Sequence, residues 1–101
     1  MKVSTFLDNN RAELSEMIDN LKLKGDFSSH KFIEKFAQTF ESEYIDFLNE
    51  YKGKGAFRKV HSQIGKFLKL NESYFKIKGK GKNGSENIFG NIDGVELWEK
   101  I

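Results

Sequence analysis

An aromatic stripe in the middle of the chain constrains the fold more than any other feature. Large apolar side chains recur there at every fourth position: Phe32, Phe36, Phe40, Tyr44 and Leu48. Residues four apart lie on the same face of an α-helix, so this spacing predicts one helix over residues 28–52 with that face in the core. Ser28 or Ser29 can cap its start. We interpret the stripe as core packing and not as a cofactor site.

A further helix is predicted on each side of the stripe. Residues 3–24 form the first, because apolar side chains again fall near helical spacing: Phe6, Leu7, Leu14, Met17, Ile18 and Leu21. After the glycine-containing turn "KGKG" at residues 52–55, a third helix is expected over residues 56–70. Gly65 lies inside it and costs about 1 kcal/mol relative to alanine, so it either permits close packing or marks an earlier helix end.

The pattern changes to a period of two from Tyr74. Four lysines then occupy alternate positions: Lys76, Lys78, Lys80 and Lys82. In a strand, this alternation would place all four on one positively charged flank. Asn83-Gly84 is a favoured tight-turn pair, so we expect a β-hairpin over residues 74–92 in which "ENIFGNI" returns as the second strand. Residues 93–101 fit either a strand or a short helix.

The length and the predicted elements together indicate a single domain of class α+β over residues 1–101, with three helices followed by a β-hairpin. Ten phenylalanines supply the core, and no cysteine is available for a disulfide, a metal site or a nucleophile. His30 and His61 show no metal-ligand spacing, and the carboxylates are scattered. We therefore expect no enzyme, no cofactor, no metal and no small-molecule substrate. With neither a signal peptide nor a long apolar run, we expect a cytoplasmic protein without membrane contact.

The charges are strongly segregated along the chain. Residues 1–50 carry a net charge of −4, residues 51–84 carry +9, and residues 85–101 carry −3. A basic surface on an acidic body indicates a polyanionic partner, and nucleic acid is the leading candidate.

Three helices, a glycine turn between the second and third, and a lysine-lined hairpin resemble the winged helix-turn-helix superfamily over about Ser28 to Ile92. The resemblance implies that the third helix enters the major groove of duplex DNA, and that the hairpin lies along the backbone or in the minor groove. On the third helix arginine can bond guanine and glutamine can bond adenine, whereas the hairpin lysines would contact phosphates. The residues thus expected at the nucleic acid are Lys54, Arg58, Lys59, Ser62, Gln63, Lys66, Lys69, Lys76, Lys78, Lys80, Lys82 and Asn83.

Other interpretations stay open at this point. Lysines also protect exposed edge strands from aggregation, so the hairpin charge alone does not establish binding. A protein-interaction module, such as a small inhibitor or adaptor, would use the segregated charges and expose an apolar patch around Phe89, Trp98 or the first helix. A homodimer through the first helix is also compatible with the sequence. Nucleic-acid binding instead requires the third-helix and hairpin cations to share one convex face.

Overall fold

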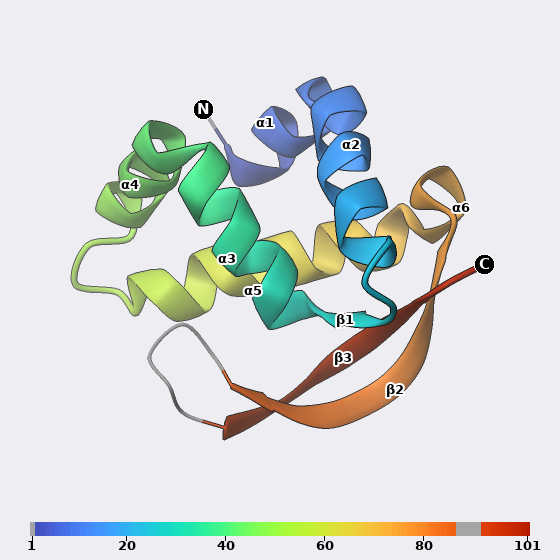
Figure 1. Cartoon of the computed structure of the whole chain (residues 1–101). Coiled ribbons are helices and arrows are strands. Elements are labelled where there is room, and N and C mark those ends of the chain that lie inside the picture. The colour runs from blue at the N-terminus through green and yellow to red at the C-terminus, as the bar shows by residue number, and fades with distance from the viewer. Residues whose placement is uncertain (1, 87–91) are drawn as a thin grey trace.

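The computed structural model describes residues 2–86 and 92–101 (Figure 1). It combines helices with an antiparallel sheet, which confirms the α+β class. Within the described chain no helix is both long and apolar enough to cross a membrane. The elements follow in the order α1 (Val3–Asn9), α2 (Arg11–Lys22), β1 (Phe27–Ser28), α3 (Ser29–Thr39), α4 (Glu41–Glu50), α5 (Ala56–Leu70), α6 (Glu72–Phe75), β2 (Ile77–Glu86) and β3 (Ile92–Lys100).

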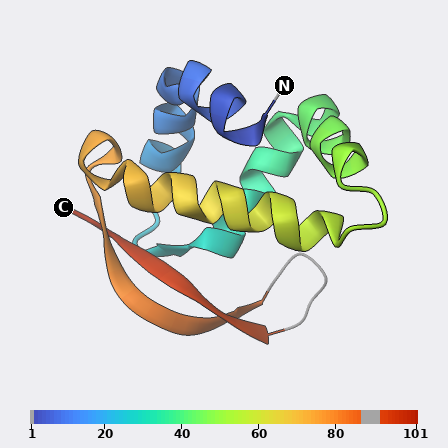
Figure 2. The ribbon, with the colours of Figure 1, turned by 180° about the vertical axis from the view of Figure 1, so that it is seen from behind.

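The helices gather on one side of the sheet, which lies below them in Figures 1 and 2. The strand order is β1-β3-β2, so β3 is the central strand. β2 pairs along one side of β3 as a hairpin, and the two-residue β1 pairs with the other side through Phe27 and Trp98. The strand between α2 and α3 therefore ties the hairpin to the helical layer.

The aromatic stripe lies in the core, as the sequence predicts. Phe32 and Phe36 are fully buried, and Tyr44 is nearly so. The ring of Phe6 on α1 packs edge-on against Phe36 and Phe40, with centroid distances of 6.2 and 5.2 Å. This aromatic packing joins α1, α3 and α4 into one hydrophobic cluster.

The first and second predicted helices are each broken into two. At Phe40 a φ of −117° and a ψ of 51° leave the helical region and separate α3 from α4. The bend keeps the Phe40 ring against the rings of Phe6 and Phe36. At Asn10 the side-chain amide donates to the carbonyl of Phe6 (2.8 Å), which satisfies a carbonyl at the end of α1. Unbroken helices over 3–24 and 28–52 are therefore wrong, whereas α5 confirms the third helix.

The hairpin turns at a different place from the one predicted. Asn83 and Gly84 lie within the β2–β3 ladder, so they do not form the turn. The predicted return strand falls mostly on residues 87–91, outside the described chain. Of the two interpretations of residues 93–101, the strand is right and the helix is wrong, because β3 extends to Lys100.

The sequence also did not predict the short helix α6 before the hairpin. Lys76 ends it with a φ of 55°, in the left-handed region that few residues other than glycine adopt. The Lys22 ammonium, on α2, donates to the carbonyl of Phe75 (2.9 Å) and helps to satisfy this helix end. Lys76 therefore lies before β2 and not within it.

Trp98 fixes the central strand beneath the helices. Its side chain is 1% exposed, and its indole N–H donates to Oγ of Ser29 at 2.9 Å. A buried N–H requires such a partner, and Ser29 is the first residue of α3. The apolar patch expected of an interaction module therefore does not include Trp98, and Phe89 lies outside the described residues.

Gly65 leads to a stability prediction. α5 continues through it, and a Cβ atom added there would meet no heavy atom within 4 Å, so neither close packing nor a helix end explains this glycine. Gly65→Ala should raise the free energy of unfolding by about 0.5–1 kcal/mol, through better helix propensity and a less flexible unfolded chain. Urea unfolding followed by the fluorescence of Trp98, the single tryptophan, measures this. A loss of stability would contradict the open space around the Cβ position of Gly65.

Candidate nucleic-acid interface

The outer side of α5 gathers most of the third-helix cations predicted from the sequence. The helix buries Val60, Ile64, Phe67 and Leu68 in the core. Residues three and four apart share a face of an α-helix. The polar residues of α5, which follow the same spacing as the buried ones, therefore gather on the opposite, solvent-facing side. Seen from behind, α5 lies at the front of the molecule with no other helix before it (Figure 2). We call this exposed surface the basic face; it comprises Lys54, Arg58, Lys59, Ser62 and Lys66.

A hollow of about 490 Å³ opens at the start of the basic face. Gly55, before the first residue of α5, has a φ of 73°, which is accessible because glycine lacks a Cβ atom. The turn at Gly55 places the preceding lysine beside the first two turns of the helix. The hollow is lined by Lys54, Gly55, Arg58, Lys59, Ser62 and Gln63. Five of these six residues are ones that the sequence assigned to nucleic-acid contact.

The cations of the basic face are not neutralised by the protein itself. Lys54, Arg58, Lys59 and Lys66 are all exposed. Across the described residues none of the four has a carboxylate within ion-pair distance. Uncompensated cations on one side of a small protein create a positive potential that attracts polyanions.

Gln63 differs from the rest of the predicted third-helix set. It is half-buried, and its amide nitrogen donates to the hydroxyl of Tyr51 at 2.9 Å. Tyr51 ends α4, so this bond links the α4–α5 turn to the helix. A glutamine held in this way is not free to bond adenine with both of its polar atoms.

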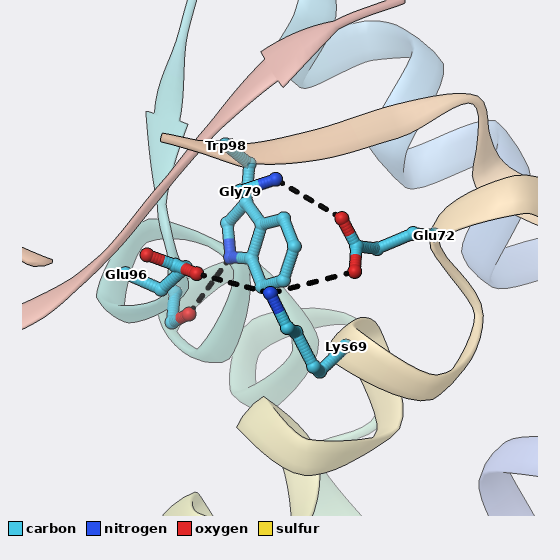
Figure 3. Close-up of polar contacts among 6 residues, drawn as sticks. Lys69, Glu72, Gly79, Glu96 and Trp98 are labelled. Carbon is cyan, nitrogen blue, oxygen red and sulfur yellow. Dashed lines mark hydrogen bonds and ion pairs between the residues drawn. The ribbon is translucent and has the colours of Figure 1, made fainter. Parts of the chain in front are cut away.

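Lys69 differs from the basic face because its ammonium, although exposed, is paired with carboxylates of the protein. Its ammonium lies 3.5 Å from a carboxylate oxygen of Glu72 and 3.6 Å from one of Glu96 (Figure 3). It also lies 5.9 Å from the centre of the Trp98 ring, within cation–π range. We call Lys69, Glu72 and Glu96 the clasp, because they join α5, α6 and β3. The clasp neutralises a cation that the sequence placed at the nucleic acid.

The clasp also explains a glycine in β2. The backbone N–H of Gly79 donates to the second carboxylate oxygen of Glu72 at 3.1 Å (Figure 3). A Cβ atom at Gly79 would clash with the carboxylate of Glu96. In sequence, the three-residue spacing of Lys69 and Glu72 on a helix could have indicated an ion pair, but Glu96 is too distant along the chain to be foreseen.

The hairpin lysines do not form the single charged flank that their alternation predicts. An extra residue in β2 shifts the register between Gly79 and Lys82, and this bulge interrupts the regular alternation of the strand. Lys76 precedes the strand, and Lys78 lies opposite Glu99. The side chains of Lys82 and Asn83 lie outside the described part.

Acidic residues offset the hairpin charge. The Lys80 ammonium contacts the Asp26 carboxylate at 2.8 Å, and this hydrogen bond raises the pKa of Lys80. The formal charges within the two strands cancel: Lys78, Lys80, Lys82 and Lys100 against Glu86, Asp93, Glu96 and Glu99. The uncompensated charge is therefore concentrated on α5 and not on the hairpin.

His61 contributes no charge to the basic face near neutral pH. It shares a 2.6 Å hydrogen bond with the hydroxyl of Tyr44 and stacks on that ring. Burial, and to a smaller degree the charge of His30, lowers the pKa of His61 from 6.5 to about 4. Its role is to join α5 to α4.

Comparison with known proteins gives no further guide to function. No family model, no curated protein and no solved structure matches this chain. In the described residues, no group of three or more His, Asp or Glu side chains could hold a metal ion. The functional assignment therefore depends on the basic face and on the chemistry of its residues.

The clasp predicts an energetic coupling between α5 and β3. In a double-mutant cycle of Lys69→Met and Glu96→Gln, the interaction energy should be about 0.5–1 kcal/mol, as for partly exposed ion pairs. Urea unfolding of the four proteins measures it. A matched cycle with Lys66→Met, which removes an unpaired lysine of the same helix, should give an interaction energy near zero. Equal coupling in both cycles would contradict a specific clasp.

His61 predicts a loss of stability in mild acid. Its pKa is lower in the folded than in the unfolded protein, so below about pH 6.5 protons bind preferentially to the unfolded chain. Stability should fall as the pH drops toward about 4, with about 1–2 kcal/mol due to His61 after allowance for its partial exposure. His61→Phe should remove that part of the pH dependence in urea unfolding. An identical pH dependence in wild type and variant would show that His61 titrates normally.

Proposed function

We propose that this chain is a non-enzymatic nucleic-acid-binding domain that contacts duplex DNA through the basic face of α5. The supporting observation is that four exposed cations have no ion-pair partner in the described chain. Arg58, Lys59 and Lys66 fall on the same side of α5, and Lys54 lies in the turn just before that helix. In the winged-helix arrangement that the proposal adopts, α5 is the recognition helix and the β2–β3 hairpin is the wing.

Duplex DNA is favoured over a single strand by the chemistry of this face. Proteins that bind single strands combine positive charge with exposed aromatic rings on which bases stack. Phe57, near the start of α5, is 43% exposed, but its ring already packs against His61 and is not a free platform for a base. A helix of this length with charge along one side is suited instead to a groove and its flanking phosphates.

The hairpin has a smaller part in the proposal than α5. Lys76 and Lys78 are exposed at its base and remain available for backbone contacts. Lys80 is paired with Asp26, and Lys69 belongs to the clasp. We therefore assign most of the electrostatic contribution to Lys54, Arg58, Lys59 and Lys66.

A protein partner is the second candidate, and exposed apolar side chains favour it. Leu23, Leu70 and Ile101 are 84%, 74% and 72% exposed. All three lie near α6. Leu23 follows Lys22, whose ammonium donates to the carbonyl of Phe75 at the end of α6. Leu70 ends α5 just before α6, and the backbone N–H of Ile101 donates to the carbonyl of Lys76 just after α6. A homodimer through the predicted first helix, now α1 and α2, has less support. Apart from Ala12, the apolar residues of both helices are buried, and their other residues are polar.

Fluorescence anisotropy with a labelled random duplex across a salt series tests the proposed function. If the four cations contact phosphates, they contribute about −3 to −4 to the log–log slope of affinity against salt. The variant Lys54/Arg58/Lys59/Lys66→Ala should therefore bind weakly, with a slope shallower by that amount.

The matched control removes the same formal charge from four lysines outside the basic face. Lys2, Lys24, Lys31 and Lys35 are exposed on or beside α1, α2 and α3, and α3 lies in front of α5 in Figure 1. Their replacement by alanine should leave the salt slope nearly unchanged. Equal weakening by both variants would mean that net charge and not the basic face drives binding, and no binding at low salt would overturn the proposal.

A further inference from the structure

The hollow at the start of α5 is lined almost entirely by hydrogen-bond donors. Lysine and arginine side chains donate but cannot accept, and a serine hydroxyl can do either. Lys54, Arg58 and Lys59 therefore present only donors, and Ser62 adds one more. The ligand that fits such a lining is rich in acceptors and negatively charged.

Gln63 is the residue of the hollow with the greatest capacity to read a base edge. Base edges in the major groove offer both donors and acceptors, and an amide side chain can match both at once. The amide nitrogen of Gln63 already donates to Tyr51 at 2.9 Å, and the side chain is half-buried. Phosphate oxygens, in contrast, only accept hydrogen bonds. They also carry the negative charge that would neutralise Lys54, Arg58 and Lys59, which have no carboxylate partner in the described chain.

The shape of the site agrees with its chemistry. At the start of α5 the surface is hollowed between Lys54, Arg58 and Lys59, so this end of the helix offers a recess to the DNA and not a projection toward a base edge. A recess lined by donors can receive a phosphate that projects from the DNA backbone.

Resting on the proposed function, we infer that the hollow seats a phosphate of the sugar–phosphate backbone and not a base edge. The first two turns of α5 would then hold duplex DNA with little sequence selectivity. In this assignment Arg58 is a phosphate contact, not a reader of guanine.

Arg58 variants on several duplexes provide the test. Wild type should bind GC-rich, AT-rich and mixed duplexes of equal length within about threefold of one another at the same salt, since phosphate contacts carry no sequence information. Arg58→Ala should weaken all of them by a similar factor, about tenfold, and make the salt slope shallower by about 0.9. Arg58→Lys keeps the charge and should restore most of the affinity on every duplex.

A base-reading role would give a different pattern. A preference of more than about tenfold for one duplex, lost in Arg58→Lys, would overturn the phosphate assignment and leave the proposed function standing, because lysine cannot reproduce the bidentate guanine contact of arginine. If wild type binds none of the duplexes at low salt, the proposed function fails. The hollow is then tested with inorganic phosphate: amide NMR shifts over residues 54–62 that vanish in Arg58→Ala uphold an anion site, and their absence overturns it.

Discussion

The amphipathic character of α5 determines where this protein places its free charge. Val60, Ile64 and Phe67 must enter the core, because the other helices and the sheet close around them. Cations cannot be buried without a partner, so the remaining positions of the helix carry them to solvent on the opposite side. The packing that folds the chain therefore also assembles the basic face, and Tyr44 and Tyr51 hold it in place through His61 and Gln63.

Ion pairs with carboxylates then determine which of the cations remain available to a ligand. Glu72 and Glu96 engage Lys69 at the far end of α5, and Asp26 engages Lys80 on the hairpin. The acidic residues of β3 are close in sequence to the hairpin lysines and far from the start of α5. Of the net charge of +9 on residues 51–84, the part that carboxylates leave unpaired is therefore concentrated on the basic face. The lysines of the edge strand β2 also discourage aggregation.

Local patterns in the sequence predicted much of the fold and part of the site. The stripe from Phe32 to Leu48, the bounds of α5 and the clustering of Arg58, Lys59 and Ser62 all follow from helical periodicity, which depends only on near neighbours. The bend at Phe40 was not foreseeable from helical periodicity, which does not describe the contact of the Phe40 ring with Phe6 of another helix. The same applies to the bulge after Gly79 and to Glu96, whose effects depend on pairing between distant segments.

Mapping the bound surface by NMR tests the central claim most directly. Backbone amide shifts should be recorded while a short random duplex is added to the wild-type protein. The account predicts that the largest changes fall between Lys54 and Lys66, with smaller ones near Lys76 and Lys78 and almost none on α2 and α3. Shifts confined to the α6 end around Leu70 and Ile101, or no shifts at all, would contradict the assignment of α5 as the nucleic-acid interface.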